Sequence, residues 1–272
     1  MPSTLDAGSL KRGVLLLKLL ATAGPRGLPL TELAIRAQLP HPSVHRVLKQ
    51  LSAERLVDQS PEFKRYRLGP LAFELGMAGS TMYDIRDLCD PSMDTLAKTT
   101  EDTVYLVVRS GFEAVCLHRR EGSFPIRALV LEVGSRRPLG VGAGGLAILA
   151  AIGEEERIEI IGRVAPSLHP FGKLSADVVA QACIRTREQG VALIQDKINL
   201  GVTAVGYPFR DGLGQVIGAL SVAALSQRMT RARIRQIAGL LHTACTEVES
   251  RLRGQVRAGW RSAASDRRGR SR

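Results

Sequence analysis

The sequence has 272 residues, 44% of them apolar, so it is long enough for two domains and is expected to be mostly globular. No apolar run reaches the roughly 20 residues that cross a membrane, and no charged start with an apolar stretch marks a secretory signal, so we expect a cytoplasmic protein. The net charge of +12 is concentrated at the ends, with +6 in residues 1–70, −1 in 71–250 and +7 in 251–272, which favours a polyanionic partner over a merely solubilising role.

The first 70 residues are expected to form a DNA-binding domain. Apolar spacing predicts a helix over about 9–23, a short second helix capped by Thr31, and a third helix over about 42–55. Residues 56–68 alternate around a Ser-Pro-Glu turn and predict a hairpin. Helices followed by a two-stranded wing are the plan of a winged helix-turn-helix.

The third helix carries the stretch PHPSVHRVLKQL, in which His41 and His45 have the spacing of two metal ligands on one helix face. Pro42 disfavours helical geometry at His41, and no further ligand occurs before Glu54, so no metal is expected. The polar face has no acid and begins at a helix N-terminus, which suits a phosphate or a base edge; a solvated basic face is the alternative. We expect DNA contacts from Thr31, His41, Pro42, Ser43, His45, Arg46 and Lys49, and from the wing residues Lys64, Arg65 and Arg67.

The rest of the chain is expected to form a helical linker over residues 71–92, broken near 76–80 and at Pro91, and then a second domain over 93–253. The pattern predicts strands over about 104–110, 113–119 and 126–134, helices over 146–162 and 175–190, two strands within 201–225, and a last helix over 231–253. That order predicts an α/β sensor-like domain with a mixed or antiparallel sheet. Residues 254–272 are expected to be a disordered basic tail.

The stretch GVGAGG at residues 140–145 matches G-x-G-x-x-G, but no buried strand leads into it and no strand-end acid follows it. We therefore expect a tight loop before a packed helix, or an anion-friendly helix start, rather than a dinucleotide site. The sequence contains no G-x-S-x-G, HExxH or P-loop motif, so no catalytic residue, metal or cofactor is expected.

Several segments together resemble the IclR family of bacterial transcription regulators: LPLTELAIRAQLPHPSVHRVLKQL, YRLGPLAFELG, DPSMDTLAKTTEDTVYL, VGSRRPLGVGAGGLAILA and GVTAVGYPFRDGLGQVIGALSV. The resemblance covers about residues 8–250. It implies an α+β fold with an N-terminal winged helix-turn-helix and a C-terminal GAF-like effector-binding domain. It further implies a homodimer or dimer of dimers that binds double-stranded operator DNA and a small organic effector, with a carboxylic acid among the candidates.

The sequence departs from the family pattern at three places. Gln38 stands where the family usually has glycine, His41-Pro42-Ser43 stands where Lys-Ser-Thr is common, and Leu146 replaces a lysine. The operator sequence therefore does not carry over, and the pocket wall is expected to be more apolar.

The resemblance also implies an effector pocket. The candidates are Tyr105, Arg127, Gly142, Ala143, Gly144, Gly145, Asp196, Ala204, Val205 and Ser221, with a loop-capping role as the alternative for Asp196 and structural roles for Tyr105 and Arg127. The expected function is a ligand-responsive transcription regulator. The alternatives are a DNA-binding protein whose second domain only oligomerises, and a small-molecule enzyme.

Overall fold

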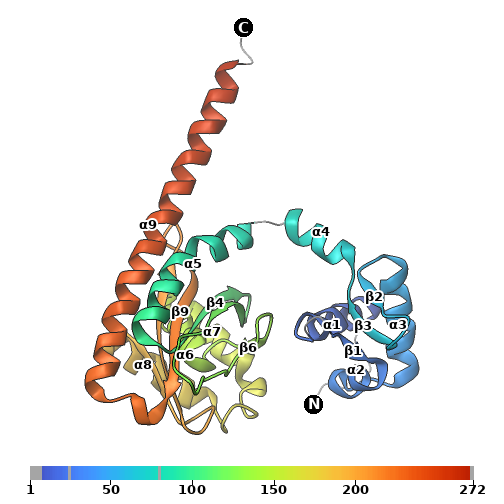
Figure 1. The fold of residues 1–272 in the computed structure, drawn as a ribbon, viewed down its shortest axis with the longest axis horizontal. Helices are drawn as coiled ribbons and strands as arrows, with labels where there is room; N and C mark the ends of the chain where they lie inside the picture. Colours follow the sequence, from blue (N-terminus) through green and yellow to red (C-terminus); the bar gives the residue numbers. More distant parts are fainter. Residues whose placement is uncertain (1–7, 24–25, 79–80, 270–272) are drawn as a thin grey trace. The chain divides into compact units, whose positions relative to one another are not determined.

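The structure is a computed structural model that describes residues 8–23, 26–78 and 81–269 (Figure 1). The chain divides into two compact units, Met1–Tyr83 and Asp84–Arg272, which we call the N-terminal and the C-terminal unit. Among the described residues, no helix is long and apolar enough to span a membrane.

The N-terminal unit has the expected winged helix-turn-helix plan. Its elements are α1 (Ser9–Ala21), β1 (Leu28–Pro29), α2 (Leu30–Ala37), α3 (His41–Ala53), β2 (Val57–Gln59), β3 (Arg65–Leu68) and α4 (Pro70–Ala78). The hairpin β2–β3 is the predicted wing, and the unpredicted strand β1 pairs with β3 to give an antiparallel sheet in the order β1-β3-β2. Leucine and valine side chains of the three helices form one core with Val57 and Tyr66 of the wing.

Two expectations about helix starts are wrong. Thr31 lies inside the first turn of α2, where Pro29 holds the N-cap position, so Thr31 is not the cap. Helix α3 begins at His41, because the carbonyl of Pro40 accepts hydrogen bonds from the amides of Ser43 (2.9 Å) and Val44 (3.1 Å). Pro42 disfavours helical geometry at His41, the residue before it, but these hydrogen bonds at the start of α3 outweigh that preference.

The expected linker is divided between the two units. Helix α4 joins the N-terminal unit, where the Leu71 amide donates to the Arg55 carbonyl (3.1 Å). Helix α5 (Thr81–Thr100) is continuous through Pro91, where a break was expected. Pro91 lies on the exposed side of α5, and the opposite side buries Met93 and Leu96, so tertiary packing maintains the helix despite the missing amide. Of the break predicted near residues 76–80, residues 76–78 are still helical in α4, so the prediction is wrong there, and residues 79–80 lie outside the described residues.

The C-terminal unit is built on a six-stranded antiparallel sheet with the strand order β6-β5-β4-β9-β8-β7. Its strands are β4 (Thr103–Ser110), β5 (Glu113–Arg120), β6 (Arg136–Pro138), β7 (Ala192–Gln195), β8 (Val202–Arg210) and β9 (Val216–Leu225). Its helices after α5 are α6 (Gly142–Ala151), α7 (Glu154–Val164), α8 (Ala176–Gln189) and α9 (Arg231–Gly269), with short 3-10 turns at Ala165–Ser167 and Ser226–Arg228.

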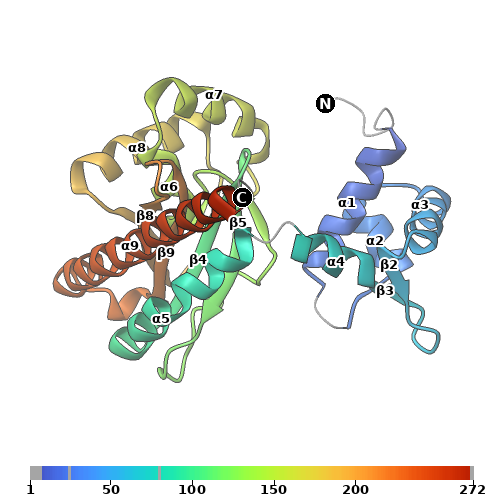
Figure 2. The same ribbon diagram turned by 90° about the horizontal axis from the view of Figure 1, so that it is seen from above.

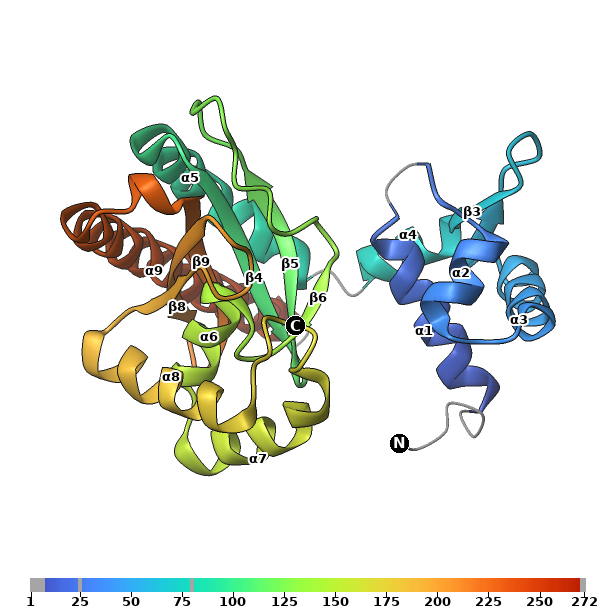
Figure 3. The same ribbon diagram turned by 90° about the horizontal axis from the view of Figure 1, so that it is seen from below.

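Helices cover both faces of this sheet, as Figures 2 and 3 show. Helices α6, α7 and α8 cover one face, where Leu139, Ile148 and Ile160 are buried. Helices α5 and α9 cover the other face, where Met93, Phe209 and other apolar side chains are buried. Because both faces are covered, the strands are apolar almost throughout, as the sequence shows for β4 and β9.

Three predicted elements differ from the structure. Residues 126–134 form no strand; instead the edge strand β6 follows them and pairs with β5. The helix predicted over 146–162 is two helices, α6 and α7, separated at Ile152–Gly153. Helix α9 continues to Gly269, where a disordered tail from residue 254 was expected.

Candidate functional site

Helix α3 presents a polar surface to solvent. Its apolar side, Val44, Val47 and Leu48, is buried in the core of the N-terminal unit. The opposite side exposes His41, Pro42, His45, Arg46 and Lys49, with Ser43 half-buried. Within the described part of the chain, neither Arg46 nor Lys49 has an ion-pair or hydrogen-bond partner, so both cations are available to an external acceptor.

The two histidines of α3 are both helical and one turn apart, so the geometric argument against a metal pair is wrong. Both are exposed, and the described residues contain no group of three His, Cys, Asp or Glu side chains that could hold a metal ion. The two histidines lie beside Arg46 and Lys49 on the exposed side of α3.

The three basic wing residues are not equivalent. Arg65 donates to the Gly27 carbonyl (2.9 Å) and fastens the wing to the turn before β1, and Arg67 pairs with Asp58 across the hairpin (2.7 Å). Lys64 lies at the exposed tip of the hairpin with a left-handed backbone (φ 50°). Of the three, Lys64 is the one whose side chain has no ion-pair or hydrogen-bond partner within the described residues.

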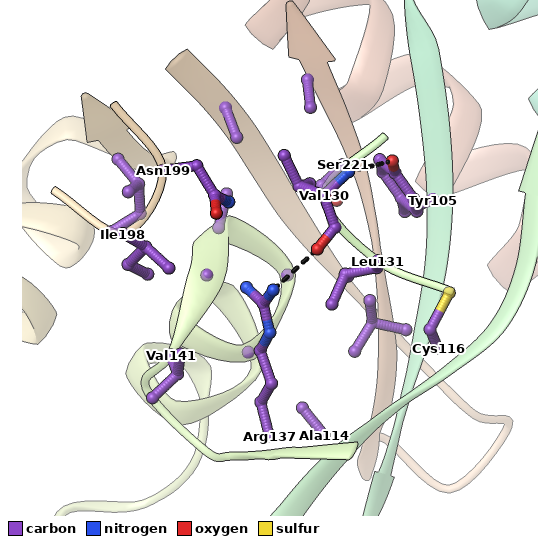
Figure 4. A pocket seen from close by; sticks show the side chains of 18 of the residues that line it. Tyr105, Ala114, Cys116, Val130, Leu131, Arg137, Val141, Ile198, Asn199 and Ser221 are labelled. Atoms are coloured by element: carbon purple, nitrogen blue, oxygen red, sulfur yellow. Dashed lines mark hydrogen bonds between the residues drawn. The ribbon is translucent and has the colours of Figure 1, made fainter. Parts of the chain in front are cut away.

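The C-terminal unit contains a cavity between the sheet and the start of α6 (Figure 4). The space between its lining residues amounts to about 600 Å³ when the open solvent at its mouth is counted. The lining is mostly apolar, with Val107, Ala114, Val130, Leu131, Val141, Ile194, Ile198, Val202, Ala204 and Ala223. Its polar side chains are those of Tyr105, Cys116, Arg137, Asn199 and Ser221.

Arg137 is the one charged side chain among the described residues that line the cavity. It reaches in from β6 and donates to the Val130 carbonyl (2.7 Å), as Figure 4 shows, and its guanidinium lies 5.8 Å from the centre of the Phe171 ring. Burial lowers the pKa of Arg137 because it removes water from the charged form, but an arginine stays protonated at neutral pH.

Tyr105 uses its hydroxyl to hold the neighbouring segment. The hydroxyl donates to the Ala128 carbonyl (2.7 Å) and accepts from the Val130 amide (2.9 Å). Burial raises the pKa of Tyr105, since ionisation would leave a charge in an apolar site. Both hydrogen-bonding capacities of the hydroxyl are therefore used within the protein.

Glycines let α6 begin close to the sheet. Gly142 has a left-handed backbone (φ 79°), and a Cβ on Gly144 would lie 3.0 Å from Val107 Cγ2. Gly206 on β8 is tighter still, because a Cβ there would lie 2.4 Å from the Ala143 carbonyl oxygen. The glycine stretch is thus the first turn of a packed helix, and the sheet before it is antiparallel, unlike that of a dinucleotide fold.

The structure brings most of the predicted pocket residues together. Residues lining the cavity are Tyr105, Gly142, Ala143, Gly144, Gly145, Ala204 and Ser221. Three candidates lie elsewhere. Arg127 is exposed and pairs with Glu121 (2.6 Å); Asp196 caps its loop by accepting from the Gly201 amide (2.8 Å); Val205 points to the opposite face of the sheet, because neighbouring residues of a strand alternate.

Sequence reasoning missed Arg137 and Asn199. The signal for Arg137 was present, because two consecutive arginines on a strand must face opposite sides of the sheet. Arg136 faces outward to Glu113 (2.9 Å), so Arg137 faces inward. Asn199 lies on an irregular loop after β7, where no periodicity could place it.

Comparison with known proteins decides the family. The model of the IclR helix-turn-helix domain matches residues 9–61, and that of the bacterial transcriptional regulator IclR C-terminal domain matches residues 78–250. The chain belongs to the IclR family of transcription regulators. The predicted family and fold class are thereby confirmed.

Relatives within the IclR family are similar over most of their length. The chain is 30% identical to the regulator XynR of Escherichia coli over 208 residues (76% of this chain, 82% of XynR), and 27% identical to the repressor AllR of Salmonella typhi over 228 residues (84% and 83%). These relatives are DNA-binding regulators, and this IclR-type chain is likewise a transcription regulator and not an enzyme.

Solved structures share the fold. An IclR regulator from Alicyclobacillus acidocaldarius has a TM-score of 0.71 at 22% identity, covering 90% of this chain and 98% of that one. An IclR homologue from Microbacterium hydrocarbonoxydans, crystallised with 4-hydroxybenzoate, has a TM-score of 0.70 at 23% identity, covering 90% and 99%.

Proposed function

We propose that this IclR-type regulator responds to a small organic effector bound in the cavity of the C-terminal unit, and that the effector alters its binding to operator DNA in the cytoplasm. The observation that carries the proposal is the mostly apolar cavity with a few polar anchors, which is the usual form of a small-molecule site. The 4-hydroxybenzoate bound by the Microbacterium homologue gives a ligand of suitable size and chemistry.

The DNA contacts are assigned to the exposed face of α3. Arg46 is the candidate for a bidentate contact with guanine, Lys49 for guanine or phosphate, and Lys64 for the phosphate backbone beside the wing. His41, Pro42, Ser43 and His45 at the start of α3 complete this surface, and exposed Thr31 on α2 lies near a phosphate.

A single recognition helix reads a half-site, so the regulator is proposed to act as a homodimer and, by its family resemblance, as a dimer of dimers. Exposed apolar side chains on two helices of the N-terminal unit support a protein contact: Leu10 is 81% exposed on α1, and Phe73 is 62% exposed on α4. The effector acts on DNA binding only if it binds two arrangements of the assembly with unequal affinity.

The test is a DNA footprint and gel shift on the region upstream of the protein's own gene, with and without a panel of organic acids. Arg46→Ala is expected to abolish the shift, while Arg185→Ala, which removes an exposed charge from α8 in the C-terminal unit, leaves it intact. A normal shift with Arg46→Ala contradicts the recognition-helix assignment.

Two alternatives have distinct signatures. If the C-terminal unit only oligomerises, no member of the acid panel raises the melting temperature, because only a ligand of the native state stabilises it. If the protein were an enzyme, it would turn over a metabolite without DNA.

A further inference from the structure

We propose that Arg137 selects the effector, and that it selects an organic anion with an apolar body over a neutral molecule of the same shape. This inference rests on the proposed function, because it concerns the ligand of the same cavity. It further assigns residues 128–131, here called the strap, as the segment that the bound anion orders.

Arg137 and its neighbour on β6 differ in their partners. Arg136 has a carboxylate partner, Glu113, at 2.9 Å and also donates to the Ser110 hydroxyl (2.9 Å). Arg137 is set among apolar side chains, and within the described residues its partners are the neutral Val130 carbonyl and the Phe171 ring. A partly buried cation without an anion is unfavourable, and a ligand carboxylate would supply that anion.

The guanidinium of Arg137 has hydrogen-bond donors that Val130 does not use. A guanidinium has five N–H donors in a planar fork, and the contact with Val130 occupies Nη2. The remaining donors leave capacity for a carboxylate, which arginine binds in a bidentate manner. A neutral amide offers this fork a single oxygen without charge, so it binds more weakly than the matched acid.

Other polar groups of the cavity do not compete for this role. The Tyr105 hydroxyl is occupied by Ala128 and Val130. Ser221 and Asn199 are uncharged and suit a second polar group on the ligand, while the rest of the lining suits an apolar body. Arg127, the arginine expected from the sequence, is exposed and already pairs with Glu121.

The strap is connected to Arg137 through Val130. The Val130 amide donates to Tyr105, and its carbonyl accepts from Arg137, so both sides of this residue are held by cavity side chains (Figure 4). The side chains of Val130 and Leu131 line the cavity. An anion on Arg137 therefore touches the inner side of the strap and reduces its motion.

The selection is tested with two matched pairs of probes, benzoate with benzamide and hexanoate with hexanamide, titrated calorimetrically into the full-length protein. At least one acid is expected to bind, with its amide weaker by at least about tenfold, the effect of a hydrogen bond to a charged group. Arg137→Met should abolish this preference and Arg137→Lys should reduce it, while Arg127→Gln, an equal loss of charge outside the cavity, should leave it unchanged.

Two results overturn the assignment while leaving the effector function intact: an amide that binds as well as its acid, or Arg137→Met retaining the preference. If neither member of either pair binds, and a wider panel of acids and amides also fails, the proposed effector function itself is wrong, and the role of Arg137 with it. Circular dichroism of each variant separates loss of binding from loss of folding. Arg137→Lys, which keeps the positive charge, serves as a second check.

The strap is tested by hydrogen exchange of residues 126–134 with saturating acid. On addition of the acid, exchange of these residues should slow in the unmodified protein and in Arg127→Gln. In Arg137→Met the exchange rate should be the same with and without the acid. Tyr105→Phe removes the other hold on Val130, so residues 126–134 of this variant should exchange faster than those of the unmodified protein in the absence of acid. Unchanged exchange in the unmodified protein on acid binding overturns the role of the strap.

Discussion

Substituting Gly206 tests the close packing that forms the floor of the cavity. A Cβ at this position on β8 would lie 2.4 Å from the carbonyl oxygen and 2.6 Å from the carbonyl carbon of Ala143. These distances fall about 1 Å short of a favourable contact of about 3.5 Å. Because the clashing atoms are backbone atoms of Ala143 in the first turn of α6, they cannot move aside alone. Gly206→Ala therefore has to push the helix away from the sheet.

Overpacking of this kind costs about 1–3 kcal/mol of unfolding free energy. In a domain of this size each kcal/mol lowers the melting temperature by about 2–4 °C, so Gly206→Ala should lower the transition of the C-terminal unit by several degrees. Thermal unfolding followed by circular dichroism measures the shift.

Gly239 on α9 provides the matched control. It is exposed, and a Cβ there would have no atom within 4 Å, so Gly239→Ala should raise stability by about 0.5–1 kcal/mol through helix propensity alone. The two alanine substitutions therefore have opposite signs. A Gly206→Ala protein as stable as the unmodified one would refute the close approach of α6 to β8.

Three further predictions concern the turn, the tail and a partly exposed ion pair. Gln38 ends α2 with a left-handed backbone (φ 53°), so Gln38→Gly should raise the unfolding free energy of the N-terminal unit by about 0.5–1 kcal/mol in urea titrations; no gain would argue against this turn geometry. Deleting residues 254–272, which carry six arginines and one aspartate, should weaken non-specific DNA binding and flatten its salt dependence, and an unchanged slope would show that the segment does not contact DNA. A hydrogen bond from Arg120, opposed by burial and aided by His118, holds the pKa of Asp90 below its ordinary value; its stabilisation is present above the unfolded-state value of about 4 and is lost as the pH falls through the folded one. Asp90→Asn should therefore make stability less dependent on pH below about 4, and an undiminished acid dependence would contradict this.

The N-terminal unit was largely predictable, because its helices follow local rules. The buried side of α3 repeats at helical spacing, and the alternating hairpin marks the wing. Errors occurred where two local preferences compete. At His41, the hydrogen bonds that the Pro40 carbonyl accepts favour a helix, and they outweigh the preference of Pro42 for an extended residue before it.

In the C-terminal unit, composition and periodicity indicated the kinds of elements but not their pairing. Residues 126–134 have the apolar character of a strand, yet they cross the cavity as an irregular segment held by Tyr105 and Arg137. Pro91 looked like a helix end, but burial of one side of α5 against the sheet outweighs one lost hydrogen bond.

The sequence alone determined the winged helix-turn-helix and the family, because both are indicated by motifs of residues near one another in the chain. The tertiary structure decided which side chains face the cavity. Arg137 comes from an edge strand, Asn199 from a loop and Ser221 from a central strand, and only the pairing of β6 with β5 turns Arg137 inward. A site assembled from distant segments depends on strand register, and no local pattern specifies which of two adjacent arginines faces the cavity.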